Sequence, residues 1–434
     1  MKLLTISLFF LINISSFAQQ DAYLLEKNDV EKEKYLIYLK QSFDDLANKV
    51  LPNHSGEIKK QLKESFTSIN KELETEIQDN QFIFDKRFLG FANEILDELK
   101  LKNNEIPKNL KILISKETVL NAYCLPNGSL VLNTGLFYWL ENEEQLASII
   151  AHEVAHEVLN HGIKSQVKYV QDNYSKTNKQ IVKNISKNEV KKVHFAFKLF
   201  QSQLYANAKI KQKHEFEADS LSYLFIKNSK YDSSQITSSM RLSIKYDSIT
   251  PKGLDKKIYK EVFNLPDQPF QEKWLKMEDF SQYNYDLFIE KIDKDSVTTH
   301  PEMDERIAKL EKNFPDLKEN FTKQASAEFL KLEKLAQMNL VSNLTDMENY
   351  GYAIYVCLLN IQNQIEVEHH KYWLGKNFEL VHEARKNYSL NRYLDRINPK
   401  NQSESYQQFL NFMWNLNLNE FSKIATYYKK ETKN

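Results

Sequence analysis

The feature that most constrains this chain is the segment 143–161, which contains the pattern His152-Glu153-x-x-His156. Apolar residues recur through it at helical spacing, which predicts one amphipathic helix over residues 143–161. Residues four apart share a helix face, so both imidazoles can reach one metal ion, with Glu153 close enough to bond a water on that ion. Polar groups on an apolar helix need partners, which favours a metal site over a solvated surface helix. Two neutral imidazoles and one position left for water are typical of catalytic zinc.

A second polar segment supplies a candidate third ligand. Within residues 214–219 (HEFEAD), Glu215 and Asp219 are four apart and share a helix face, whereas Glu217 points nearly the opposite way. Glu215 is therefore the expected third ligand, and Asp219 could hold the far nitrogen of a ligand histidine. His214 is a competing ligand, and a solvated acidic face is the alternative.

The rest of the chain predicts a mostly helical protein with one small sheet. Only eight of the 434 residues are glycine, and helical spacing dominates. The period changes to two over residues 110–115 and 121–133, with a turn at 126–128, which predicts a short antiparallel hairpin just before the His152 helix. An unpaired strand edge there could accept an extended peptide, or the hairpin could be scaffold alone. The 59 basic and 59 acidic residues balance, which argues against nucleic acid or an anionic membrane as a partner.

The amino terminus predicts export. Residues 1–18 combine Lys2 with an apolar run and end in Ser16-Phe17-Ala18, as in a cleaved signal peptide, so the mature chain would begin near Gln19. The run is shorter than the roughly 20 residues that span a bilayer, although an uncleaved anchor is the alternative. No later segment has 18 consecutive apolar residues. We expect a periplasmic protein, or a secreted one, without an integral membrane segment after cleavage.

Several motifs occur in the order found in a known family. The chain resembles the zinc metallopeptidase family of HtpX, BepA and the CAAX prenyl proteases. The residues that carry the resemblance are Asn121-Ala122, Pro126-Asn127-Gly128, Thr134-Gly135-Leu136, His152-Glu153-x-x-His156, Glu215-x-x-Ala218-Asp219 and His300-Pro301 with Arg306. They span residues 81–310, about half of the chain. The metzincin alternative fails because Leu159 stands where that motif needs glycine.

The resemblance implies a zinc metalloendopeptidase with one Zn2+ per chain. His152, His156 and Glu215 would be the zinc ligands, and Glu153 the general base. The implied fold is α+β and predominantly helical, a zincin-like domain with a small sheet between helical N- and C-terminal regions.

Further roles also come from the resemblance. Asp219 would orient a ligand histidine, and His300 and Arg306 would shape the site or stabilise the oxyanion. One strand would bind the substrate backbone. Its residues are Asn121, Ala122, Tyr123, Cys124, Leu125 and Pro126.

The expected domains are a signal peptide (1–18), an N-terminal helical region (19–80), the peptidase domain (81–310) and a C-terminal helical region (311–434). The last could be a degenerate repeat that binds protein partners. Residues 250–297 are irregular and aromatic, and could form a lid or an insertion packed on the outside. Cys124 and Cys357 are expected to be free thiols.

The predicted function is hydrolysis of peptide bonds in extended or misfolded proteins of the cell envelope. One alternative is an exported chaperone or assembly factor with a dormant zinc site. A further alternative is a structural zinc site closed by His300. Two departures from the family are visible: the segment between His156 and Glu215 is too charged to span a membrane, and the stretch before His300 is unusually long.

Overall fold

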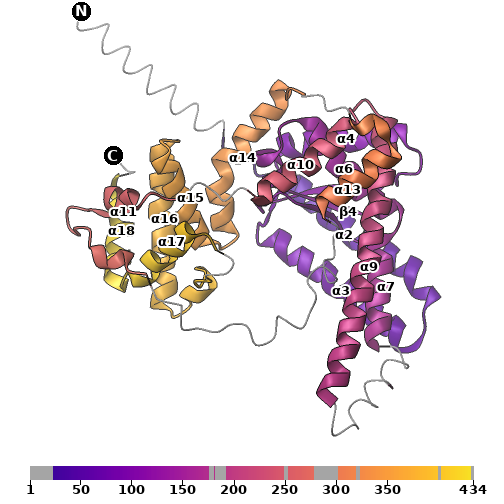
Figure 1. Ribbon diagram of the computed structural model, residues 1–434, viewed down its shortest axis with the longest axis horizontal. Coiled ribbons are helices and arrows are strands. Elements are labelled where there is room, and N and C mark those ends of the chain that lie inside the picture. Colours follow the sequence, from indigo (N-terminus) through magenta and orange to yellow (C-terminus); the bar gives the residue numbers. More distant parts are fainter. Residues whose placement is uncertain are drawn as a thin grey trace, which may run out of the picture. The chain divides into compact units, whose positions relative to one another are not determined.

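The computed structural model describes residues 23–174, 180, 192–248, 253–277, 302–318, 323–398 and 402–431 (Figure 1). The predicted fold class, α+β and predominantly helical, is confirmed. The predicted signal peptide and His300 lie outside the described residues. None of the helices in the described part is long and apolar enough to cross a membrane.

The chain divides into two compact units, each with a core of its own. Unit 1 comprises residues 1–115, 119–246 and 286–336, and unit 2 comprises residues 116–118, 247–285 and 337–434. The helices of unit 1 are α2 (Asp29–Val50), α3 (Gly56–Gln78), α4 (Lys86–Lys102), α5 (Thr134–Trp139), α6 (Glu143–Val158), α7 (His161–Tyr174), α9 (Lys192–Lys227), α10 (Ser234–Ser248), α13 (Met303–Asn313) and the first half of α14 (Ala327–Asp346).

One four-stranded sheet is present in the described residues of unit 1. Its strands are β1 (Phe82–Ile83), β2 (Lys111–Ser115), β3 (Ala122–Cys124) and β4 (Ser129–Asn133), in the order β1-β2-β4-β3. The predicted hairpin is β3 and β4, which pair antiparallel. Sequence periodicity did not anticipate that β2 and β4 run parallel, or that two-residue β1 joins the sheet. β3 is therefore an edge strand.

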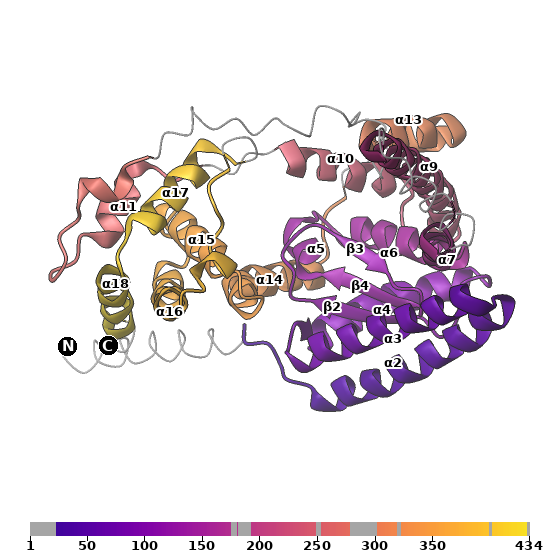
Figure 2. The ribbon, with the colours of Figure 1, turned by 90° about the horizontal axis from the view of Figure 1, so that it is seen from below.

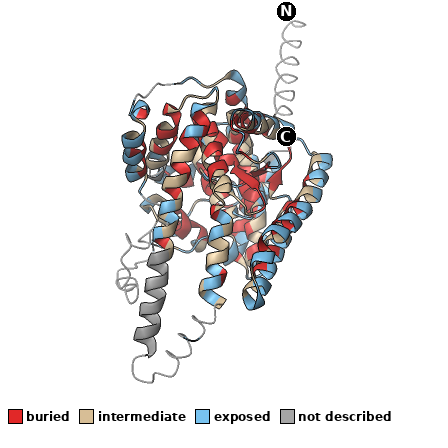
Figure 3. Ribbon diagram, turned by 90° about the vertical axis from the view of Figure 1, so that its right-hand side faces the viewer, coloured by how far each residue is buried: buried red, intermediate tan, exposed pale blue. Residues whose placement is uncertain are grey.

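Alternate residues of the sheet face two helical layers, because successive side chains of a strand point to opposite faces. Leu113 and Val131 pack with α2 and α3, which lie below the sheet in Figure 2. The opposite face packs against α4 and α6 through Ile112, Ile114, Leu130 and Leu132. Burial on both faces is visible as the red centre of Figure 3. The sheet is thus a rigid support for α6 and for the edge strand beside it.

α6 begins and ends at identifiable signals. The Asn142 side chain accepts hydrogen bonds from the amides of Glu144 and Gln145, as expected of a helix N-cap. The helix predicted to reach residue 161 ends at Val158, so that boundary was wrong. Asn160 is left-handed, with φ of 54°, a conformation that asparagine tolerates. The chain therefore turns, and His161 begins α7 instead of extending α6.

Unit 2 is helical. Its elements are α11 (Lys256–Phe263), η2 (Glu272–Leu275), the rest of α14, α15 (Tyr350–Gln362), α16 (Val367–Lys386), η5 (Leu390–Arg392), α17 (Glu404–Asn415) and α18 (Leu418–Glu431). Within the irregular segment 250–297, residues 253–277 are described and contribute Tyr259, Phe263 and Trp274 to this core. This part of the segment is packed structure, and residues 278–297 lie outside the description. Cys357, in this core, and Cys124 are both free thiols, as expected.

Candidate metal centre

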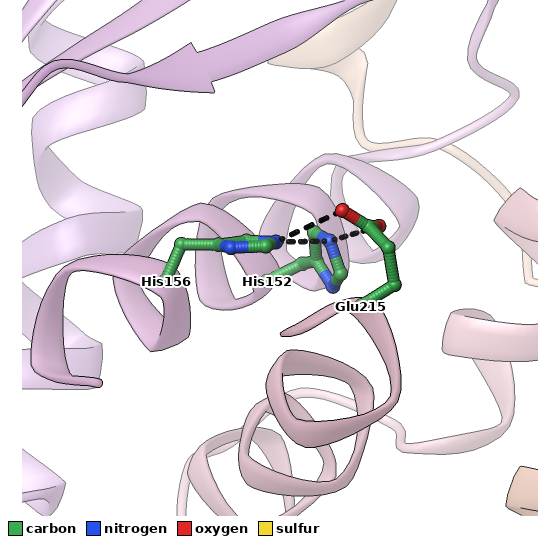
Figure 4. Close-up of side chains that lie close together, drawn as sticks. All are labelled: His152, His156 and Glu215. Atoms are coloured by element: carbon green, nitrogen blue, oxygen red, sulfur yellow. Dashed lines mark hydrogen bonds and ion pairs between the residues drawn. The ribbon is translucent and has the colours of Figure 1, made fainter. Parts of the chain in front are cut away.

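The packing of α6 against α9 brings His152, His156 and Glu215 together (Figure 4). The Nε2 atoms of His152 and His156 are 3.1 Å apart. The Glu215 oxygens lie 3.5 Å from His152 Nε2 and 3.6 Å from His156 Nε2. Ligand atoms about 2.0–2.1 Å from a tetrahedral zinc ion would lie about 3.3 Å apart. The donor set and its spacing therefore fit one zinc ion.

Asp219 and Arg306 lie behind this group and are almost fully buried. His152 Nδ1 is 3.1 Å from Asp219 Oδ1, on the ring edge opposite the metal position. Arg306, from α13, donates through Nε and Nη2 to Asp219 at 2.9 and 2.6 Å, and its Nη1 lies 3.2 Å from Glu215. Because its guanidinium is committed to both carboxylates, Arg306 is placed to position Glu215 and Asp219.

The charges around the two histidines shift their pKa values in opposite directions. Burial lowers the pKa of His152, but the carboxylates of Asp219 and Glu215 beside its ring outweigh this effect and raise the pKa to about 10. Burial lowers the pKa of His156 to about 3, and the neighbouring His152 adds to this effect. Burial acts to raise the pKa of Asp219, but His152 and Arg306 hold it below its usual value.

Glu153 lines the cleft beside the group of three. Burial raises its pKa to about 7, with opposition from His152 and a further upward contribution from Glu215. The nearby backbone amide of Cys124 acts to lower this pKa. A carboxylate whose pKa lies near neutrality can both accept and release a proton under physiological conditions.

The group opens into a cleft of about 490 Å³. Asn121, Ala122, Tyr123 and Cys124, four of the six residues predicted to bind substrate, line it. The other two do not: Leu125 is partly buried against the α2/α3 core, and Pro126 is absent from the lining. The physical reason is the turn that starts at this point and carries the chain away from the cleft into β4.

The edge of β3 facing the cleft is open. Asn121 accepts from the Asn133 amide, and the Leu125 amide donates to Ser129, so the odd-numbered residues pair with β4. Because backbone groups alternate in direction along a strand, those of Ala122 and Cys124 point away from β4. This edge can pair with an extended chain.

The sequence did not point to several cleft residues. Ile236, Ser239, Met240 and Ser243 of α10 line one side, and no motif marks them. His161 was not singled out either, although its place shortly after His156 could have drawn attention. His161 Nδ1 lies 3.0 Å from His156 Nδ1.

The structure separates the two competing candidates for third ligand. His214 stacks on His161, with ring centroids 4.0 Å apart, and its neighbour Glu215 lies against the HExxH pair. His300, the remaining predicted site residue, lies outside the described residues.

A site of this kind, two helices presenting two histidines and a glutamate beside an open strand edge, is that of a metallopeptidase. Residues 92–314, just over half of the chain, match the family model described as Peptidase family M48. The chain belongs to this family. The resemblance inferred from the sequence is confirmed.

Curated relatives match over shorter stretches. The mitochondrial metalloendopeptidase OMA1 of Arabidopsis thaliana is 28% identical over 127 residues, 28% of this chain and 23% of that protein. The β-barrel assembly-enhancing protease of Yersinia pestis is 28% identical over 79 residues, 18% and 16% of the two chains. Human OMA1 is 33% identical over 81 residues, 18% and 15%. The matched stretches thus cover less than a quarter of each relative.

Proposed function

We propose that this member of the M48 family is a zinc-dependent endopeptidase that cuts extended segments of cell-envelope proteins. The observation that carries the proposal is the group formed by His152, His156 and Glu215 beside the open edge of β3, in which the two Nε2 atoms are 3.1 Å apart and each lies 3.5–3.6 Å from a Glu215 oxygen. His152, His156 and Glu215 would hold the ion. Asp219 would keep the His152 ring in the orientation that points Nε2 at it.

Glu153 is the proposed general base. It accepts a proton from the attacking water and delivers it to the leaving amine, and its burial in the cleft suits both transfers. A bound zinc ion supplies Lewis acidity that polarises the scissile carbonyl and favours deprotonation of water. Arg306 holds Glu215 and Asp219 in place, so the oxyanion needs another donor. His300 remains the proposed residue for that role.

The substrate is held by its backbone. An extended segment adds beside β3 and hydrogen-bonds to the outward amide and carbonyl groups of Ala122. Such binding depends little on the substrate's side chains and requires a substrate strand that is not already paired. Unfolded segments should therefore be preferred as substrates over folded domains. The envelope location rests on the signal-like residues 1–18 and on the likeness to a protease named for β-barrel assembly.

The test compares wild type with Glu153→Gln, measuring zinc content and cleavage of casein, an unfolded substrate, with and without a chelator. We expect about one zinc per chain in both proteins, and chelator-sensitive cleavage by wild type alone. The expected loss in kcat is at least about 100-fold, the scale of a removed general base. Undiminished turnover by Glu153→Gln would refute its role. A wild type that binds zinc without cleaving casein would favour the chaperone alternative.

The preference for extended substrates is tested by comparing the cleavage of folded and destabilised forms of one protein. The same full-length protein is given one substrate protein in its native form and after destabilisation. Cleavage should be confined to the destabilised form. Equal rates on both forms would contradict edge-strand binding.

A further inference from the structure

Both ligand histidines have a second ring nitrogen, and the structure gives each a different neighbour. His152 Nδ1 faces Asp219. His156 Nδ1 faces His161 Nδ1 at 3.0 Å, and His161 Nε2 lies 3.2 Å from Glu217 Oε2. His161 is almost fully buried at the start of α7, and Glu217 sits on α9 two residues after Glu215.

The positions of the ring protons follow once His156 binds the metal through Nε2. An imidazole that offers the Nε2 lone pair to a metal carries its hydrogen on Nδ1. His156 Nδ1 therefore donates, and His161 Nδ1 must accept. A neutral His161 then carries its hydrogen on Nε2, where it can donate to Glu217. Each contact in the series is a donor facing an acceptor.

We propose that His161, held in place by Glu217, is a positioning residue that aims His156 at the metal. It does for His156 what Asp219 does for His152. The two ligand histidines are thereby oriented from separate elements, His152 by α9 directly and His156 through α7. The inference deepens the proposed zinc site and rests on it.

A second metal ion is the competing interpretation. His161, His214 and Glu217 also offer three donor atoms within 4.8 Å of one another. An ion held there would need the lone pair of His161 Nε2, which would move the hydrogen to Nδ1. Two N–H groups would then face each other across 3.0 Å whenever His156 binds zinc. The proton count therefore favours one ion per chain.

The experiment measures zinc stoichiometry and the zinc dissociation constant of the full-length chain by chelator competition. His161→Ala should raise the dissociation constant about 10–100-fold, the usual effect of losing a partner of a ligand histidine. His161→Asn should recover most of that affinity, because its Oδ1 can replace Nδ1 as acceptor. The melting temperature of each metal-free variant separates a loss of metal binding from a loss of fold.

The matched control is Lys213→Ala, which removes the other ion-pair partner of Glu217, 3.4 Å away, and should leave zinc affinity unchanged. Unchanged affinity in His161→Ala would overturn the inference while leaving the zinc site intact. The positioning role is also refuted if the Asn variant binds zinc as weakly as the Ala variant. Two zinc ions in wild type and one in His214→Ala would establish the second-ion interpretation instead. A wild type that binds no zinc would remove the proposed site itself.

Discussion

At the scale of single residues, the candidate centre is a buried set of charged side chains in which acidic and basic groups lie next to one another. Arg306 contacts both Glu215 and Asp219. Its planar guanidinium bonds Asp219 through two nitrogens, a geometry that lysine cannot copy. Removing one partner of such a buried pair leaves an uncompensated charge, and this is more costly than losing a surface pair.

Arg306→Ala should therefore lower the free energy of unfolding by about 3–5 kcal/mol, with a smaller loss for Arg306→Lys. Denaturant unfolding of the metal-free proteins measures this. The control is Arg241→Ala, which breaks a partly exposed pair with Glu311 and should cost about 0–1 kcal/mol. Equal losses at positions 306 and 241 would contradict the buried-network account.

At the scale of elements, the site depends on how β3, α4, α6 and α9 are held. β3 offers its outer edge because its inner edge is satisfied by β4. The N-cap of α4 is Asp85, whose carboxylate accepts hydrogen bonds from the amides of Glu26 and Arg87 and from the Arg87 side chain. This cap fixes the start of a helix that packs on the sheet face shared with α6.

Ala122→Pro should remove the outward amide of β3 while sparing the bonds to β4, since proline is tolerated where an edge-strand N–H faces away from the sheet. One lost backbone hydrogen bond of about 1–1.5 kcal/mol corresponds to a roughly 5–12-fold lower kcat/KM. Steady-state cleavage of an unfolded substrate checks this, with Ala122→Gly, which keeps the amide, as control. An unaltered kcat/KM in the proline variant would argue against pairing at this edge.

Asp85→Asn should destabilise the protein in a pH-dependent way. Burial acts to raise the pKa of Asp85, but the bonds from Arg87 and Glu26 outweigh it and lower the pKa below its usual value. A lowered carboxyl pKa contributes stability above the unfolded pKa of about 3.9, and that stability is lost as pH falls through the folded pKa.

The free energy of unfolding, measured from pH 7 to pH 3, should be about 2–3 kcal/mol lower for Asp85→Asn than for wild type. This difference should be constant above pH 5 and shrink below about pH 4. Asp97→Asn, at an exposed carboxylate of the same helix, is the control and should show little deficit at any pH. A stability difference between Asp85→Asn and wild type that grows as the pH falls would contradict the proposed role of the Asp85 carboxylate.

At the scale of the whole molecule, two units with separate cores share one chain. Unit 2 takes residues 253–277 from the middle of the sequence, and Trp274 is fully buried there with its indole nitrogen donating to Glu420. A C-terminal deletion would therefore expose Tyr259, Phe263 and Trp274, which pack in the unit 2 core. Point substitutions test the two units more cleanly than truncation.

Trp274→Ala should lower the stability of unit 2 by about 3–5 kcal/mol, as expected for a large buried aromatic side chain. Calorimetry should show one of two melting transitions shifting down, with zinc affinity preserved. Phe88→Ala, the matched change in the core of unit 1, should shift the other transition and weaken zinc binding. A single transition that both variants shift equally would show that the units unfold together.

The sequence by itself determined what spacing within one element can determine. His152 and His156 share a helix face because they are four apart, Glu215 and Asp219 likewise, and the alternation after residue 120 marked the hairpin. These relations are local, so they can be predicted without knowledge of the tertiary structure. The mostly helical α+β class followed from composition and periodicity in the same way.

Tertiary structure alone decided the relations between elements. Several relations depend on the packing of segments far apart in sequence: α6 meets α9, Arg306 contacts two carboxylates, the outward groups of β3 are those of Ala122 and Cys124, and α6 stops before His161. A spacing rule cannot supply them, because the energy that selects one packing arrangement comes from burial summed over the whole core.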